Sequence, residues 1–165
     1  FQSFAQLLFP LVQSNIKTNI WGIGWLQERE KVKRHFGCIM PRAWMHGFLP
    51  YKKSANVYIS SKMVLGIQNA RDQVTQRTFE ILGTGSFMIA SRTPALQEMF
   101  VDKRDLVMTD SAEETLDLVK FYLHKPQQRL RIGYNARRKV MKHYTYVRHL
   151  QNVWPRLEQL LTGKQ

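Results

Sequence analysis

Three side chains near the middle of the chain have the types and spacing to bind a phosphorylated ligand: Arg77, Thr78 and Glu80. They follow a polar loop and open an amphipathic segment, and the first turn of a helix carries unpaired N–H groups and a partial positive charge. Arg77 would offer a bidentate guanidinium to a diphosphate, and Thr78 would add a hydroxyl. Glu80, one turn further on, could accept hydrogen bonds from the two hydroxyls of a ribose. On spacing alone, an exposed ion pair between Arg77 and Glu80 is the simpler interpretation.

Two glycine-containing turns are further candidates for contact with a ligand. Gly22 and Gly24 follow a short apolar run and would let the backbone approach a phosphate or sugar, although a lone G-x-G also makes a tight turn. His46, beside Gly47, could reach a ligand from the end of a strand, or it could be an ordinary loop histidine.

The elements that must position these residues alternate along the first two thirds of the chain. Short apolar runs predict buried strands over residues 19–24, 44–49, 63–68, 87–90 and 106–109. Helical patterns over 51–60, 75–82 and 94–100 separate the later strands, and residues 4–13 predict an apolar helix in which Pro10 must lie near an end or a kink. The alternation predicts an α/β fold: a mainly parallel, Rossmann-like sheet flanked by helices, with its ligand at the carboxyl ends of the strands.

Three helices are predicted to close the chain. Ser111 and Glu114 form a capping box at the start of the first, and Pro126 starts the second, whose inner stripe is expected to be Leu130, Ala136 and Val140. The third covers about residues 146–161, and Pro155 should bend or break it. Its expected inward face consists of Leu150, Val153, Leu157 and Leu160.

The charge of the chain suggests a polyanionic partner. The formal net charge is +13, and it is distributed as +7 over residues 1–70, −1 over 71–110 and +7 over 111–165. Nucleic acid, anionic lipid and phosphorylated substrates all fit such a balance.

Several kinds of chemistry have no support in the sequence. Its 165 residues contain one cysteine, Cys38, which excludes an internal disulfide and a multi-cysteine zinc site. The histidines have no metal-ligand spacing, and no window approaches 18 consecutive apolar residues. The chain starts at Phe1 without Met or a signal-peptide layout, and we expect it to be a piece of a longer protein.

Five segments, quoted in order, together resemble one protein family: Lys62-Met-Val-Leu-Gly-Ile-Gln68, Arg77-Thr-Phe-Glu-Ile-Leu-Gly-Thr-Gly85, Phe87-Met-Ile-Ala-Ser-Arg-Thr-Pro94, Leu96-Gln-Glu-Met-Phe100 and Tyr144-Thr-Tyr146. The family is the glycosyltransferase-like family of CgeB-type (YkvP-like) spore proteins, which is related to the group 1 glycosyltransferases. The upstream Gly22-Ile-Gly-Trp25 and His46-Gly47 also match its layout. The resemblance covers about residues 18–155.

This resemblance implies the C-terminal, donor-binding half of a GT-B glycosyltransferase, in which a nucleotide-sugar is held between two Rossmann-like domains. Glu80 is then expected on the ribose, Arg77 and Thr78 on the diphosphate, and Gly22 and Gly24 under the sugar or phosphate. Asp72 takes the first of two acidic positions eight residues apart, where relatives more commonly have Glu.

Further expectations concern the whole domain and its partners. Residues 1–165 should form one donor-binding domain whose terminal segment, 146–165, packs against a missing N-terminal domain that also supplies any general base. No cofactor or metal is expected, a UDP-sugar is the expected donor, and the acceptor is unknown. The expected location is cytoplasmic, peripheral at a membrane or spore surface, with an anionic membrane as a further partner. Two other classes stay open: a non-catalytic structural spore or envelope protein with this fold, and a basic nucleic-acid-binding module, for which the sequence has no recognised motif.

Overall fold

The computed structural model describes residues 2–163, so the expected domain of residues 1–165 extends at both ends outside the described residues. The first half contains α1 (Gln2–Leu7), α2 (Phe9–Gln13), α3 (Arg29–Phe36), a 3-10 turn (Arg42–Trp44) and α4 (Tyr51–Ser60). The second half contains β1 (Val64–Gly66), α5 (Gln76–Gly83), β2 (Met88–Ser91), α6 (Pro94–Met99), β3 (Val107–Thr109), α7 (Ala112–Leu123), α8 (Pro126–His143) and α9 (Tyr146–Thr162).

The three strands form one parallel sheet in the order β1-β2-β3, with Leu65 beside Ile89 and Ile89 beside Val107. Each crossover between them contains a helix, α5 and then α6, as parallel pairing requires. The predicted α/β class and parallel sheet are therefore confirmed.

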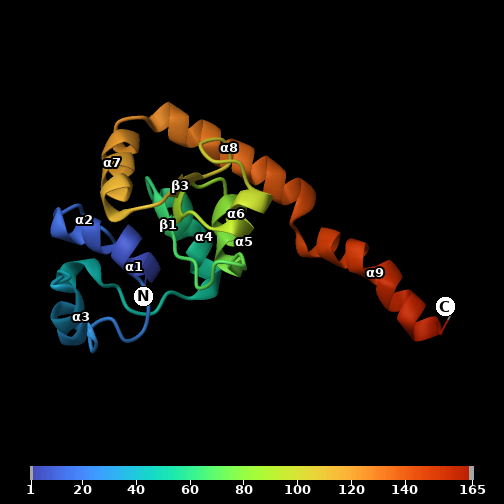
Figure 1. Cartoon of the computed structure of the whole chain (residues 1–165), viewed down its shortest axis with the longest axis horizontal. Coiled ribbons are helices and arrows are strands. Elements are labelled where there is room, and N and C mark those ends of the chain that lie inside the picture. The colour runs from blue at the N-terminus through green and yellow to red at the C-terminus, as the bar shows by residue number, and fades with distance from the viewer. Residues whose placement is uncertain (1, 164–165) are drawn as a thin grey trace.

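Helices cover both faces of this sheet, and the alternation of side chains along the strands explains how (Figure 1). Met88 and Ala90 of β2 lie in one buried cluster, together with side chains of α4, α5, α6 and α8. Phe87 and Ile89 point to the opposite face and join a second cluster with α1, α2 and α7. Strands β2 and β3 are buried on both faces and β1 is half-buried at Val64 and Leu65, which is why their sequences are continuous apolar runs.

The two predicted strands at residues 19–24 and 44–49 are much shorter than expected. One parallel bridge joins Ile20 to Met45, and Arg42–Trp44 forms a 3-10 turn. Gly22, Gly24 and Gly47 all have positive φ, which ends the extended backbone after a single pair. The apolar side chains of this region still form a third buried cluster, with α2 and α3 around Ile20 and Met45.

Most helix boundaries follow local sequence signals. The predicted helix over 4–13 is divided into α1 and α2, and Pro10 occupies the first turn of α2, where a missing N–H is tolerated. The Ser111 hydroxyl accepts the Glu114 N–H at 3.1 Å, and the Glu114 carboxylate accepts the Asp110 N–H at 2.6 Å, as the capping box predicts. In α8, Ala136 and Val140 are buried as expected but Leu130 is 64% exposed, because Ile132 and Gly133 face the domain instead.

The prediction for the last helix is wrong in two respects. Helix α9 continues through Pro155 without a break, and the chain turns before it, at Tyr144 and Thr145. No residue of α9 is buried, and its expected inward residues Leu150, Leu157 and Leu160 are exposed. Figure 1 shows α9 extending away from the rest of the chain, so this apolar face has nothing to pack on within the described residues.

Candidate functional site

The predicted site residues lie on loops and helix starts that follow parallel-paired segments. Gly22, Gly24 and His46 follow the Ile20–Met45 bridge, and α5 follows β1. Leu65 of β1 packs against the cluster that contains Ile20 and Met45, so β1 is the neighbour of the bridged pair. This is the edge of the sheet at which α/β proteins bind ligands.

Hydrogen bonds hold the two glycine turns together. The Gly22 N–H donates to the Gly47 carbonyl at 2.7 Å, and the His46 N–H donates to the Ile20 carbonyl at 2.8 Å. Gly22 has a φ of +149°, which other residues rarely adopt, and a Cβ there would also lie 2.8 Å from Nε1 of Trp25, so this turn favours glycine. The structure therefore brings the Gly22 turn beside His46, more than twenty positions away in the sequence.

The His46 side chain forms an exposed platform with an aromatic neighbour. Its ring stacks on Trp21, with centroids 4.9 Å apart, and its Nε2 lies 2.9 Å from Oδ1 of Asn19. An exposed ring pair of this kind can take a planar base by stacking. Trp21 and Asn19 are not among the residues predicted from the sequence, although an aromatic residue directly before a G-x-G turn is a visible signal.

Thr78 does not present its hydroxyl to a ligand in this structure. Its side chain has no exposed surface, and its Oγ1 lies 2.9 Å from Nε2 of Gln68 and 3.1 Å from Oγ1 of Thr75. The expected contact between the Thr78 hydroxyl and a diphosphate would require this network to open. Thr78 instead fixes the first turn of α5 to the loop after β1.

Gln68, which is not among the residues predicted from the sequence, organises this loop. It is 5% exposed, its Oε1 accepts the Thr75 N–H at 3.2 Å, and its main-chain carbonyl accepts the Ser3 hydroxyl at 2.8 Å. One buried amide thus joins the loop to α5, and its backbone joins the loop to α1.

Arg77 and Glu80 are accessible on α5, as a ligand would need. No ion pair joins them among the described residues, and Glu80 instead accepts a hydrogen bond from Nε2 of Gln76 at 3.0 Å. Both lie close enough to Tyr58 of α4 to act on its phenol: burial raises the pKa of Tyr58 most, Arg77 lowers it and Glu80 raises it. The two charged groups therefore lie on the α4 side of α5.

Asp72, the first of the two acidic positions, lies on the exposed loop between β1 and α5. Its place in the loop leaves its carboxylate open to solvent near the start of α5. The structure thus keeps Asp72, Arg77 and Glu80 on one loop-helix unit.

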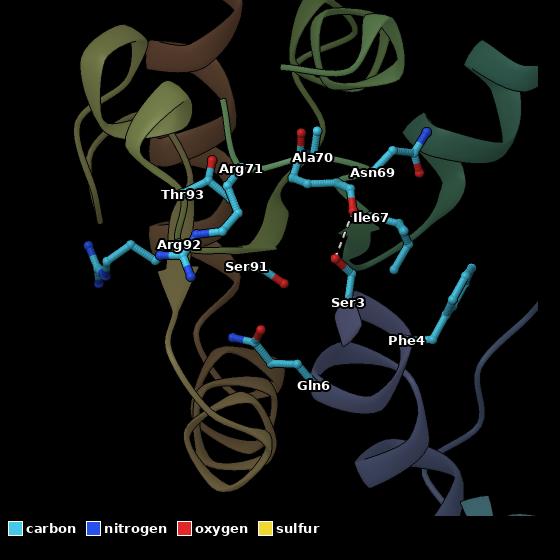
Figure 2. Close-up of a pocket in the computed structure, with 11 residues that line it drawn as sticks. Ser3, Phe4, Gln6, Ile67, Asn69, Ala70, Arg71, Ser91, Arg92 and Thr93 are labelled. Atoms are coloured by element: carbon cyan, nitrogen blue, oxygen red, sulfur yellow. Dashed lines mark hydrogen bonds between the residues drawn. The ribbon is translucent and has the colours of Figure 1, made fainter. Parts of the chain in front are cut away.

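A pocket of about 360 Å³ opens beside this unit, at the ends of β1 and β2 (Figure 2). Its lining comes from α1 (Ser3, Phe4, Gln6), from residues 67–71 and from residues 91–93. None of the seven predicted site residues lines it. Its walls are far apart in sequence, so no local pattern could reveal it.

Arg92, at one edge of the pocket, is held by two carboxylates. Its guanidinium lies 2.9 Å from Asp102 and 2.9 Å from Asp110. These hydrogen bonds raise the pKa of Arg92. The Arg92 side chain therefore links the loop after β2 to the loops before and after β3.

Two features are absent from the part of the chain that the structure describes. No group of three or more His, Cys, Asp or Glu side chains there could hold a metal ion. None of its helices is both long enough and apolar enough to cross a membrane.

Comparison with known proteins shows the family to which the chain belongs. The sequence matches the glycosyl transferase-like family over residues 4–154, and the chain belongs to that family. No protein of curated function matches it. The fold is that of the C-terminal domains of GT-B glycosyltransferases.

Three solved structures illustrate the likeness. HepE of Anabaena, in complex with UDP-glucose, is 13% identical with a TM-score of 0.74, and the match covers 95% of this chain and 46% of HepE. Sucrose-phosphate synthase of Thermosynechococcus elongatus is 14% identical with a TM-score of 0.66, over 84% of this chain and 35% of that one. The C-terminal domain of the group 1 glycosyl transferase LpcC of Francisella tularensis is 14% identical with a TM-score of 0.53. The match covers 88% of this chain and 97% of that domain. The chain thus spans less than half the length of HepE.

Proposed function

We propose that this chain is the nucleotide-sugar-binding domain of a GT-B glycosyltransferase that transfers a sugar from a UDP-sugar to an acceptor still unknown. The observation that carries the proposal is the placement of Arg77 and Glu80, accessible at the start of α5, on the ligand-binding edge of a parallel sheet. The match with HepE, a protein solved with UDP-glucose, supports the choice of nucleotide.

In this proposal each group has a defined task. Glu80 accepts hydrogen bonds from the ribose hydroxyls. The guanidinium of Arg77 and the N–H groups of the first turn of α5 face the diphosphate. Gly22 and Gly24 let the backbone approach the phosphate or sugar, and the ring pair of Trp21 and His46 is available to the base.

Transfer breaks the bond between the anomeric carbon and the diphosphate oxygen, and negative charge develops on the departing UDP. Arg77 and the dipole of α5 stabilise that charge. This scheme uses no metal or other cofactor. The base that takes the proton from the acceptor hydroxyl is expected from a second domain. The isolated chain should therefore bind UDP but not catalyse sugar transfer.

The finer assignments belong to the same proposal. The order of the quoted motifs favours the CgeB-type subfamily, with a location in the cytoplasm or peripheral at a spore surface. The exposed apolar face of α9 is suited to packing on an N-terminal domain, as expected for residues 146–165.

The experiment is a calorimetric titration of the chain with UDP, GDP and TDP. We expect saturable binding of UDP, and about tenfold or greater weakening in Glu80→Ala and Arg77→Ala, since each loses charge-assisted hydrogen bonds. Glu98→Ala and Arg131→Ala remove exposed charges elsewhere and should bind like the parent chain. Unchanged binding in both site variants would refute the assigned roles.

A second candidate is a non-catalytic structural protein that keeps the fold. Asp72, where relatives more commonly have Glu, favours it. If the folded chain bound no nucleotide even when joined to its other domain, this candidate would replace the first. A nucleic-acid-binding module would instead show binding that weakens steeply with salt and is not competed by nucleotides.

A further inference from the structure

We propose that a second pocket, between the end of α4 and the start of α8, binds the phosphate headgroup of an anionic lipid. Its volume is about 300 Å³, at the lower end of the range for small-molecule sites. Its lining consists of Ile59, residues 61–62, residues 84–87, Pro126, Arg129 and Leu130. This inference goes beyond the proposed function, because it concerns a partner other than the nucleotide-sugar.

This pocket lies at the edge of the sheet opposite to the expected nucleotide site. Residues 61–62 come just before β1, and residues 84–87 come directly before β2. The Val64 N–H donates to the Phe87 carbonyl at 2.9 Å, which holds the two segments side by side. Because the strands are parallel, both begin at this edge, whereas α5 follows the carboxyl end of β1. A ligand in this pocket would therefore leave the nucleotide site free.

Two cations line the pocket, and no acidic side chain does. Lys62 is exposed and forms no ion pair among the described residues, so its ammonium keeps its N–H donors. Arg129 donates through Nη1 to the carbonyls of Tyr122 and Leu123, which leaves the N–H groups of Nε and Nη2 available. An ammonium and a guanidinium are the usual partners of a phosphate, so these donors favour an anion of that kind.

The other groups of the lining argue against a sugar or a nucleic acid. The hydroxyls of Ser61 and Thr84 donate to main-chain carbonyls at 2.7 and 2.6 Å, so neither has a proton left for a sugar hydroxyl. Among the described residues that line the pocket, Phe87 alone is aromatic, and it is 4% exposed. A base of a nucleic acid would therefore have no ring to stack on.

Apolar side chains at the pocket distinguish a lipid from a free phosphate. Ile59 near the end of α4 and Leu130 in the second turn of α8 are both 64% exposed, and both line the pocket. Exposed apolar side chains beside cations are typical of surfaces that enter the boundary between headgroups and acyl chains. Helix α8 has six Lys or Arg residues and no Asp or Glu, so the surface around Leu130 complements an anionic bilayer.

The test is sedimentation of the chain with vesicles of phosphatidylcholine, with and without phosphatidic acid, whose headgroup is a bare phosphate. We expect binding only to the vesicles that contain phosphatidic acid. Lys62→Gln should weaken this binding about fivefold, the usual contribution of one cation at an anionic surface. The matched control is Lys52→Gln, which removes the same charge from an exposed position at the other end of α4 and should bind like the parent chain. Equal losses in both variants would show attraction by net charge alone and overturn the inference.

A second pair of variants tests the apolar contact. Ile59→Ser should weaken vesicle binding, because it removes an apolar side chain from the pocket. Ile39→Ser changes another exposed isoleucine, far from α4 and α8 in the sequence, and should bind like the parent chain. Unchanged vesicle binding in Ile59→Ser would overturn the assignment to a lipid.

An NMR titration of the ¹⁵N-labelled chain separates a lipid from a free phosphate. We expect saturable shifts at the amides of Lys62, Ser86 and Leu130 with dihexanoyl phosphatidic acid, and much weaker binding of inorganic phosphate. Equal affinity for the two probes would assign the pocket to free phosphate and overturn the lipid.

This inference and the proposed function can fail separately. Lys62→Gln should bind UDP like the parent chain, because the two sites lie at opposite edges of the sheet. UDP binding without any preference for phosphatidic acid would overturn the lipid inference alone. Binding to phosphatidic acid that depends on Lys62, without any UDP binding, would support the lipid inference and contradict the proposed function.

Discussion

At the scale of single residues, the site depends on a buried amide that has no charge and no catalytic chemistry of its own. Gln68 joins the loop after β1 to the start of α5 through Thr75 and Thr78. The accessible Arg77 and Glu80 lie on that helix, so their positions depend on this buried connection.

Replacing Gln68 with alanine should therefore affect both stability and binding. The change leaves the buried hydroxyl of Thr78 and the half-buried N–H of Thr75 without their Gln68 partner, and we expect a loss of about 1–3 kcal/mol in the free energy of unfolding. UDP binding should weaken as well, because the first turn of α5 loses its anchor. Urea unfolding and calorimetry measure the two effects. The control is Gln97→Ala, which changes an exposed glutamine on α6. Equal unfolding free energies and equal UDP affinities in the two variants would contradict the role given to Gln68.

Cys38 is a chemical probe of the buried cluster around Ile20 and Met45, because its thiol is part of that cluster. The side chain is 1% exposed, and burial raises the pKa of its thiol. The folded state thus favours the neutral thiol; this contribution to stability is complete below the pKa of the unfolded chain and is lost as the pH rises through the folded value.

At pH 8, a disulfide reagent such as DTNB should react with Cys38 only at the rate at which the chain unfolds, because the thiolate is the reactive form. Urea should increase the rate in step with unfolding. A chain carrying Cys38→Ala and Ser60→Cys should react at once, since Ser60 is exposed. Fast reaction of Cys38 in the folded chain would show that this cluster opens locally.

At the scale of the elements, α8 lies directly against the turn that follows α5. A Cβ on Gly133 of α8 would lie 2.0 Å from the carbonyl oxygen of Gly85. A Cβ on Gly83, at the end of α5, would meet Val140 at an ordinary distance of 3.6 Å. The two helices can pack this closely only because Gly133 has no side chain.

Gly133→Ala should destabilise the chain by about 3 kcal/mol or more, because backbone must move to admit the methyl group. Gly83→Ala is the matched control and should be neutral or stabilising by up to about 1 kcal/mol, since alanine favours the helix. Urea denaturation of both variants measures the contrast. Similar urea midpoints for Gly133→Ala and Gly83→Ala would mean that α8 can move away from the turn at Gly85 at little cost.

Helix α9 makes no comparable contribution to the domain, because none of its residues is buried. A chain that ends at residue 145 should change the free energy of unfolding by less than about 1 kcal/mol. Val140→Ala, which truncates a buried side chain of α8, should cost about 1–3 kcal/mol in the same assay. A large loss on deleting α9 would show that it packs on the domain in solution.

At the scale of the whole molecule, part of the basic charge is concentrated on one helix near the end of the chain, α8. Helix α8 has six Lys or Arg residues and no Asp or Glu. Its exposed Tyr134 lies under the guanidinium of Arg138, 5.7 Å from the ring centroid, and Leu130 and Met141 are exposed on the same helix. We propose that this surface contacts anionic lipid, as expected from the charge of the sequence.

The chain should therefore sediment with vesicles that contain phosphatidylserine and not with pure phosphatidylcholine, and high salt should weaken the binding. Arg131→Glu with Arg138→Glu should abolish most of it. Lys52→Glu with Lys53→Glu on α4 changes the net charge equally and should retain binding. Equal losses in both variants would indicate attraction by net charge alone, and no preference for anionic vesicles would remove this partner.

The sequence by itself determined the elements whose signals are local. Continuous apolar runs specified β1, β2 and β3, because strands covered by helices on both faces of a sheet need no polar alternation, and β2 and β3 are fully buried. The capping box placed the start of α7, and the polar loop before residue 76 placed Arg77 and Glu80 at the start of α5.

The tertiary structure decided everything that depends on groups distant in the chain. The Ile20–Met45 bridge, the burial of Thr78 by Gln68 and the close contact of Gly133 with Gly85 have no local signature. The pocket likewise joins residues near the start of the chain to the end of β2. Periodicity reports whether a side chain prefers to be buried, but not which surface will bury it. For this reason α9 has a clear apolar face in sequence and no partner in the described structure.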